Sequence, residues 1–171
     1  MKIYDVAVQP GRIGISALPG GSGDLAGDVT AIADWGATLV VTLVDDAELG
    51  PDGQGRLPNL LADRDVAWRH LPVTDFGVPS ADVATEWPEV AAAANRILDD
   101  GGRVLVHCRG GCGRSGMIAL RLMIERGEAP DDALTRLRDV RSCAVETEAQ
   151  FLWASENSRR SGSWPGPGTR N

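Results

Sequence analysis

A cysteine, an arginine and a serine share one short glycine-rich segment of the chain. The segment reads Val104-Leu105-Val106-His107-Cys108-Arg109-Gly110-Gly111-Cys112-Gly113-Arg114-Ser115-Gly116. Its apolar start predicts a strand that leads Cys108 into a loop, and a helix is expected to begin near Arg114. Backbone N–H groups and the positive end of a helix favour a bound anion, and the same field favours a thiolate over a thiol. The segment therefore predicts an anion-binding loop with a cysteine nucleophile at its floor.

The residues around Cys108 suit that chemistry. The glycines of the loop allow backbone conformations closed to other residues and a close approach to a ligand; they are Gly110, Gly111 and Gly113. Arg114 offers a planar fork that matches two oxygens of a phosphoryl group and stays charged. The hydroxyl of Ser115 can donate to the cysteine sulfur, which stabilises the thiolate as nucleophile and later as leaving group. His107 is expected to support the loop through ring hydrogen bonds rather than to transfer protons.

This His-Cys-x5-Arg-Ser arrangement resembles the signature of the cysteine-dependent protein tyrosine phosphatase superfamily. Flanking segments are similar, in their order along the chain, to cyclin-dependent kinase-associated phosphatases and their bacterial relatives. These segments are Ala17–Gly20, Leu57–Leu61, His70–Pro79, Leu137–Arg141 and Ala144–Gln150. The resemblance covers roughly residues 10–155, which is most of the chain.

The resemblance implies a role for each matching residue. Cys108 would attack phosphorus and form a phosphocysteine, and Asp75 would act first as general acid and then as general base. Gln150 would position the attacking water. Arg114 and the loop residues would hold the phosphate oxygens; the loop residues are Arg109, Gly110, Gly111, Cys112 and Gly113. The implied activity is hydrolysis of protein phosphotyrosine, phosphoserine or phosphothreonine, with no metal and no other cofactor.

Structural interpretations remain open beside these roles. Cys108 can be read as a small buried residue at a strand end, or with His107 and Cys112 as part of a zinc site. Zinc is disfavoured because a structural zinc site usually needs four ligands and no second cysteine pair follows. Asp75 can be a turn residue, and Gln150 a surface amide of a helix.

Other functions also stay open at this point. The same chemistry could act on a small phosphorylated metabolite or a phosphoinositide. The chain could bind phosphoproteins without turnover, although the full set of Cys108, Arg114, Ser115 and Asp75 argues against this. Sulfur transfer of the rhodanese type is a further alternative. It is disfavoured because Arg114 and Ser115 end the loop.

Cys112 stands four residues after Cys108 and raises a redox hypothesis. An oxidised Cys108 could be trapped as a disulfide with Cys112. The interpretation favoured by the sequence is a small side chain packed under the loop. Cys143 lies in a separate segment and is expected to be a bystander.

Composition limits the class of protein. The 171 residues fit one domain, and 43% hydrophobic and 24% charged residues are ordinary values for a globular chain. The formal charge of −7 and the lack of a basic patch argue against nucleic acid as a partner. No apolar run is long enough to span a bilayer, no signal peptide is visible, and a catalytic thiolate needs reducing conditions. These features predict a cytoplasmic protein that acts on a phosphorylated protein or a small phosphomonoester.

Hydrophobic periodicity predicts alternating strands and helices. Strands are expected over 38–44, 66–71 and 103–107, and helices over 24–35, 57–63, 80–99, 115–126, 131–141 and 147–158. Residues 1–23 are predicted to form short strands and turns, and residue 45 is expected to start a loop. The fold class is α/β, a single domain with a central, mostly parallel sheet and helices on both faces. The catalytic domain is assigned to 1–157, and the tail 158–171 is expected to be disordered.

Overall fold

The computed structural model describes residues 1–156 and 166, with backbone only for 51–54. The strands are β1 Tyr4–Val8, β2 Gly11–Ser16, β3 Ala37–Thr42, β4 Ala67–His70 and β5 Arg103–His107. The helices are α1 Leu25–Asp34, α2 Asp46–Ala62, α3 Ala81–Asp99, α4 Gly113–Glu125, α5 Pro130–Val140 and α6 Glu148–Ser155. The prediction of a disordered tail falls, apart from residue 166, outside the described residues.

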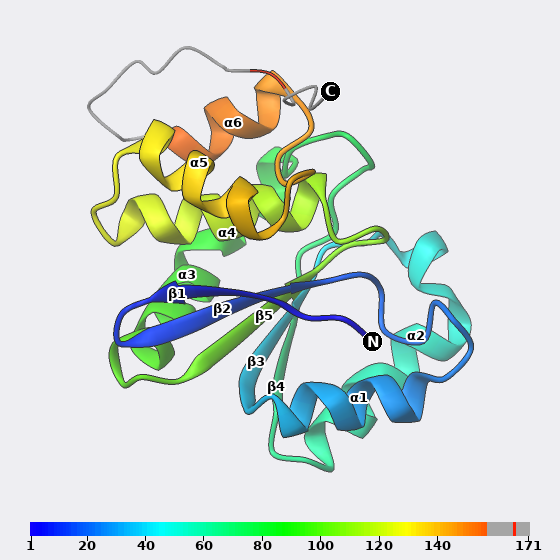
Figure 1. Cartoon of the computed structure of the whole chain (residues 1–171). Helices are drawn as coiled ribbons and strands as arrows, with labels where there is room; N and C mark the ends of the chain where they lie inside the picture. The colour runs from blue at the N-terminus through cyan, green and yellow to red at the C-terminus, as the bar shows by residue number, and fades with distance from the viewer. Residues whose placement is uncertain (157–165, 167–171) are drawn as a thin grey trace.

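The strands form one five-stranded sheet in the order β1-β2-β5-β3-β4 (Figure 1). β1 pairs antiparallel with β2, and the other neighbours are parallel. The predicted mostly parallel sheet is therefore confirmed. β5 lies between β2 and β3 at the centre of the sheet. The loop after it therefore lies at the carboxyl ends of the parallel strands, where α/β proteins bind ligands.

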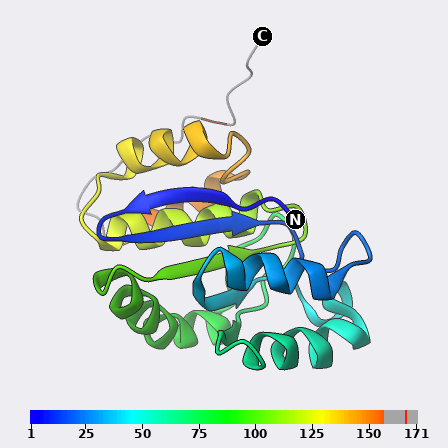
Figure 2. The ribbon, with the colours of Figure 1, turned by 60° about the horizontal axis from the view of Figure 1, so that its bottom comes forward.

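Helices cover both faces of the sheet, as Figures 1 and 2 show. Successive side chains of a strand point to opposite faces, and β5 follows this rule. Leu105 packs with residues of α1 and α2, whereas Val104 and Val106 pack with residues of α3 to α6. The α/β fold class predicted from the sequence is confirmed.

The helix that follows the signature loop lies inside the domain. Every residue of α4 from Gly113 to Met123 is buried, as expected for a helix that is apolar nearly all round. Burial on all sides fixes the position of its first turn, which carries Arg114 and Ser115. In the part of the chain that the structure describes, no helix has both the length and the apolar character needed to cross a membrane.

The segment that begins at Asp45 is helical, and the predicted loop there is wrong. Asp45 and Glu48 form a capping box, in which each side chain accepts the backbone N–H of the other residue. Gly50, with φ of +68°, kinks the helix, so α2 consists of two stretches. The glycine explains why the sequence suggested a loop. The capping box places Glu48 in a fixed first turn beside the signature loop.

Candidate active site

The signature loop joins the central strand to the buried helix. β5 ends at His107 and α4 begins at Gly113, so the loop occupies 108–112 at the carboxyl end of the sheet. Cys108 has a free thiol that is 3% exposed. Its Sγ lies 3.3 Å from Oγ of Ser115, the contact that the sequence suggested. The hydroxyl can donate to a thiolate at this distance.

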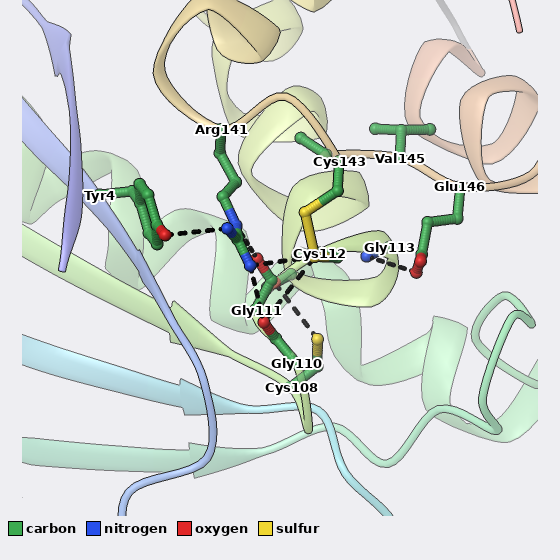
Figure 3. Close-up of a disulfide and its surroundings, with 12 residues drawn as sticks. Tyr4, Cys108, Gly110, Gly111, Cys112, Gly113, Arg141, Cys143, Val145 and Glu146 are labelled. Carbon is green, nitrogen blue, oxygen red and sulfur yellow. Dashed lines mark hydrogen bonds between the residues drawn. A yellow bond between two sulfur atoms is a disulfide. The ribbon is translucent and has the colours of Figure 1, made fainter. Parts of the chain in front are cut away.

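Arg141 holds the outer side of the loop (Figure 3). Its Nε and Nη2 donate to the carbonyl oxygens of Gly111 and Gly110 at 2.8 and 3.0 Å, and its Nη1 donates to Tyr4 Oη at 2.9 Å. The C=O and N–H of a trans peptide point in opposite directions, so these contacts turn the next N–H groups away from Arg141. The N–H groups of residues 109–112 have no acceptor among the described residues. They are available to an anion.

Arg114 is buried and is held by three oxygen groups from other elements. Its Nη1 and Nη2 donate to the Glu48 carboxylate at 2.5 and 2.9 Å, and Nη1 also donates to the Val73 carbonyl at 2.9 Å. Asp75 Oδ1 lies 3.1 Å from Nη2. The Nε of Arg114 is buried and has no acceptor among the described residues. A buried unpaired donor is costly, and a bound phosphate oxygen would satisfy it.

Glu48 and Arg114 stabilise each other's charge. The hydrogen bonds from Arg114 lower the pKa of Glu48, and they outweigh the opposing effect of burial. Burial works against the charge on Arg114, but Glu48 and the nearby Cys108 and Asp75 more than compensate and raise the guanidinium pKa. Both groups are therefore charged at neutral pH.

The loop that carries Asp75 is tied to the start of α6. Thr147 Oγ1 donates to the Phe76 carbonyl at 3.3 Å, and Gln150 Nε2 donates to the Gly77 carbonyl at 3.2 Å. Phe76 has φ of +57°, an unfavourable conformation for a bulky residue. Its side chain is 58% exposed beside Asp75. Strained residues of this kind cluster at functional sites.

Gln150 is fully buried, so the interpretation as a surface amide is wrong. Its Oε1 accepts the backbone N–H of Glu146 at 2.9 Å, and its Nε2 is bonded to Gly77. Both ends of the amide thus connect backbone segments beside the signature loop. A Cβ on Gly113 would lie 2.2 Å from the Glu146 carboxylate and 3.0 Å from Gln150 Oε1, so a larger residue there would displace the Glu146 side chain.

Glu146 is a second carboxylate on the signature loop. It accepts the Gly113 N–H at 2.8 Å (Figure 3). The preceding Val145 is buried with φ of +62°, and Arg138 donates to its carbonyl at 2.9 Å. This strained turn aims Glu146 at the first turn of α4.

His107 is fully buried below the loop, and the supporting role suggested for it stays a prediction. Its Nε2 lies 2.7 Å from Thr42 Oγ1, which also accepts from Trp68 Nε1 at 2.8 Å. Burial lowers the pKa of His107 to about 3. The ring is therefore neutral at physiological pH.

The cysteine predictions need correction. Cys112 forms a disulfide with Cys143, with Cα atoms 5.2 Å apart, and Cys108 is free (Figure 3). Cys143 is thus no bystander, and Cys112 is neither a simple packed residue nor joined to Cys108. The sequence missed the pair because the turn after α5 returns Cys143 to the loop from 31 residues away.

The zinc alternative finds no support in this arrangement. In this structure Cys112 is bonded to Cys143, which leaves only His107 and Cys108 of the three suggested ligands. Within 1–156 and 166, no group of three or more His, Cys, Asp or Glu side chains lies close enough to hold a metal ion.

Three residues of the site were missed from the sequence. They are Glu48, Arg141 and Glu146. Glu48 had a local signal, because Asp45-x-x-Glu48 has the pattern of a capping box. Its contact with Arg114 joins residues 66 positions apart, which no local pattern shows. Arg141 and Glu146 lie in segments that carried the family resemblance, but nothing in their spacing pointed to the loop.

Replacing Glu48 by glutamine should destabilise the protein and loosen Arg114. Glutamine keeps the shape but loses the charge, and hydrogen bonds to charged groups contribute about 1.5–3 kcal/mol. We expect the free energy of unfolding at neutral pH to fall by about 1–3 kcal/mol, and KM to rise. Urea unfolding measures the first effect and initial rates the second. Glu89→Gln, at an exposed position of α3, is the control.

The effect of Glu48 on stability should depend on pH. Its folded pKa lies below the usual 4.5, so its stabilisation is complete above that value and is lost as the pH falls through the folded pKa. The stability difference between the wild type and Glu48→Gln should shrink in acid. A difference that stays constant down to about pH 3 would contradict this assignment.

Reducing the Cys112–Cys143 disulfide should destabilise the fold. The bond spans 31 residues, and a crosslink of that span stabilises by roughly 3.7 kcal/mol in the chain-entropy account. Thermal unfolding with and without a thiol reductant measures the loss. Cys143→Ser should show the same loss without reductant and no further loss with it. An unchanged Tm after proven reduction would contradict the prediction.

Known proteins share this sequence pattern. Residues 13–128 match the family described as a polymorphic toxin system DSP-PTPase phosphatase. Mouse cyclin-dependent kinase inhibitor 3 is 30% identical over 154 residues, which cover 84% of this chain and 70% of the mouse protein. The human protein of that name is 33% identical over 107 residues, which cover 59% of this chain and 49% of the human protein.

Solved structures share the fold. Kinase associated phosphatase with its catalytic-site cysteine replaced by serine has a TM-score of 0.74 and 24% identity, covering 91% of this chain and 93% of its own. The active form of Tk-PTP has a TM-score of 0.67 and 31% identity, covering 85% and 90%. Since the family match spans most of the chain and includes the signature loop, the chain belongs to the DSP-PTPase family of cysteine-dependent tyrosine and dual-specificity phosphatases.

Proposed function

We propose that this phosphatase acts through a phosphocysteine on Cys108. The observation that carries the proposal is a buried free thiol at the floor of a loop whose amides, together with Arg114 Nε, lack acceptors among the described residues. Such a loop takes the oxygens of a phosphoryl group and stabilises the charge that builds up during transfer. The covalent intermediate divides one difficult displacement into two easier steps.

In the first step, the sulfur of Cys108 attacks phosphorus and the ester oxygen leaves with a proton from Asp75. In the second step, water attacks the phosphocysteine, Asp75 takes a proton from it, and the thiolate leaves with help from Ser115. The contact of Asp75 with Arg114 supports its place over the loop. The role of Gln150 in positioning water stays a prediction, and its bonds to Glu146 and Gly77 support an action through these neighbours.

We infer that the substrates are phosphorylated proteins, with aryl esters preferred. The exposed ring of Phe76 beside Asp75 offers an apolar contact to the ring of a phosphotyrosine. The curated relatives include a bovine protein named protein tyrosine phosphatase type IVA 3, 29% identical over 129 residues. Membership of a phosphatase family disfavours both sulfur transfer and binding without turnover, and a net charge of −7 disfavours anionic lipid surfaces.

The cytoplasmic location and the domain bounds 1–157 also stay proposals. Reducing conditions would keep Cys108 as the thiol that the mechanism needs. The same conditions remove most disulfides, so in the cytoplasm we expect Cys112 and Cys143 as thiols. The continuous core of residues from β1 to α6 supports a single catalytic domain.

Rapid-quench analysis tests the mechanism directly. The wild type is mixed with p-nitrophenyl phosphate in the presence of a chelator, quenched early and digested. We expect hydrolysis to continue with the chelator, and the phosphoryl group to be found on the peptide that contains Cys108. Loss of activity with the chelator, or a phosphoryl group on another residue, would overturn the proposal.

A further inference from the structure

A cavity of about 580 Å³ opens beside the signature loop. Arg109 and Gly110 of the loop line one side, and Lys2, Tyr4 and Leu18 of the amino-terminal segment line another. Glu48, which holds Arg114, also reaches it, so the cavity is continuous with the surroundings of the phosphate loop. It is large enough to take an amino-acid side chain together with its backbone.

Cationic groups dominate this cavity. The ammonium group of Lys2 lies 4.5 Å from the centre of the Tyr4 ring, and the guanidinium of Arg141 lies 4.3 Å from the same ring. Arg109 is exposed, and its carbonyl accepts the Leu18 N–H at 3.2 Å, whereas its guanidinium has no hydrogen-bond or ion-pair partner among the described residues. The cavity is therefore a local cationic site on a protein with a net charge of −7.

The carboxylates that line the cavity are already neutralised. Glu48 is paired with Arg114 through both oxygens. Asp28 accepts the Gly20 N–H at 2.8 Å and pairs with the Met1 amino group at 3.1 Å. Arg141 already donates hydrogen bonds to the loop carbonyls and to Tyr4, so it contributes positive charge to the cavity but few free N–H groups. Lys2 and Arg109 remain as donors for an incoming anion.

We propose that this cavity is an accessory subsite that binds an acidic side chain next to the phosphorylated residue of a peptide substrate. The inference rests on the proposed phosphatase function and specifies its substrate class. Two free cationic donors match one carboxylate, and the rings and alkyl groups of Tyr4 and Leu18 match its apolar stem. A membrane surface fits less well, because the acidic body of the protein would be repelled by anionic lipids.

Lys2 provides the test because it is exposed, lies outside the phosphate loop and is the single lysine of the sequence. Two phosphotyrosine peptides that differ only by aspartate or asparagine beside the phosphotyrosine are compared as substrates. The enzymes are the wild type, Lys2→Gln, Lys2→Arg and Arg96→Gln. Arg96 is exposed on α3 and serves as the matched loss of a remote positive charge.

We expect the wild type to prefer the aspartate peptide in kcat/KM, mainly through KM, and the preference to weaken as salt is raised. Lys2→Gln should reduce the preference by about two- to fivefold, the range for an exposed ion pair. Lys2→Arg should keep the preference, and Arg96→Gln should not change it. Activity on p-nitrophenyl phosphate, which has no second acidic group, should be the same for all four enzymes.

Each result separates the subsite from the catalytic proposal. Equal kcat/KM for the two peptides, or a preference that Lys2→Gln leaves unchanged, overturns the subsite while hydrolysis of p-nitrophenyl phosphate upholds the mechanism. A soluble short-chain phosphoinositide is tested as a further substrate. If Lys2→Gln lowers kcat/KM for the phosphoinositide and not for either peptide, the peptide assignment is wrong. Should no substrate be hydrolysed, the mechanism fails, and equilibrium binding of both peptides to the wild type and Lys2→Gln still decides the subsite.

Discussion

Replacing Cys108 by serine should abolish turnover and leave substrate binding intact. A serine hydroxyl is a far weaker nucleophile at neutral pH than a thiolate. The loss of an enzyme's nucleophile costs many orders of magnitude, so we expect kcat to fall by more than about 10⁴-fold. Initial rates with p-nitrophenyl phosphate and with a phosphotyrosine peptide measure this loss.

The fold should tolerate this change. Cys108 is 3% exposed, and serine is nearly isosteric with it. The amides of the loop and Arg114 remain in place to hold phosphate, so equilibrium binding of the phosphotyrosine peptide should stay close to that of the wild type. Arg114→Lys provides the contrast, because a point charge cannot serve Glu48 and a phosphate together as the planar fork does. That variant should lose binding as well as turnover.

Two results would contradict the assignment. Measurable turnover by Cys108→Ser in a preparation free of wild-type enzyme would show that another group attacks phosphorus. Loss of peptide binding together with an unchanged Tm would show that Cys108 acts in recognition instead of chemistry.

The parts of the site that could be predicted from the sequence are local in the chain. The strand before Cys108, the loop glycines and the helix that begins near Arg114 follow one another directly, so periodicity and residue type were sufficient. The contact between Cys108 and Ser115 spans only seven residues across the first turn of α4. Asp75 followed from the family resemblance, and the structure places it 3.1 Å from Arg114.

The parts that could not be predicted depend on the packing of distant elements. Arg141 reaches the loop carbonyls because α5 ends beside α4. The sequence of neither helix shows that the two helices pack together. The disulfide follows from the same geometry, since the turn after α5 carries Cys143 back over Cys112. Val145, a β-branched residue with positive φ, runs against local preference, and the contacts that Arg138 and Gln150 make with this turn orient Glu146.

Asp75→Asn should slow the enzyme strongly on esters with basic leaving groups. Protonation by a positioned acid contributes about 10²- to 10⁴-fold, and asparagine keeps the shape of the side chain but has no acidic proton to give. We expect a loss of that size in kcat for phosphotyrosine and phosphoserine peptides. Hydrolysis of p-nitrophenyl phosphate should suffer much less, because its leaving anion is stable without a proton.

Phosphate binding should not weaken in this variant, because the substitution removes a negative charge that lies 3.1 Å from Arg114 Nη2. Competitive inhibition by inorganic phosphate should be unchanged or stronger. Asp82→Asn, which alters a similarly exposed carboxylate at the start of α3, should leave both rate and inhibition as in the wild type. An equal loss of kcat on p-nitrophenyl phosphate and on phosphoserine peptide would mean that Asp75 positions the loop and donates no proton.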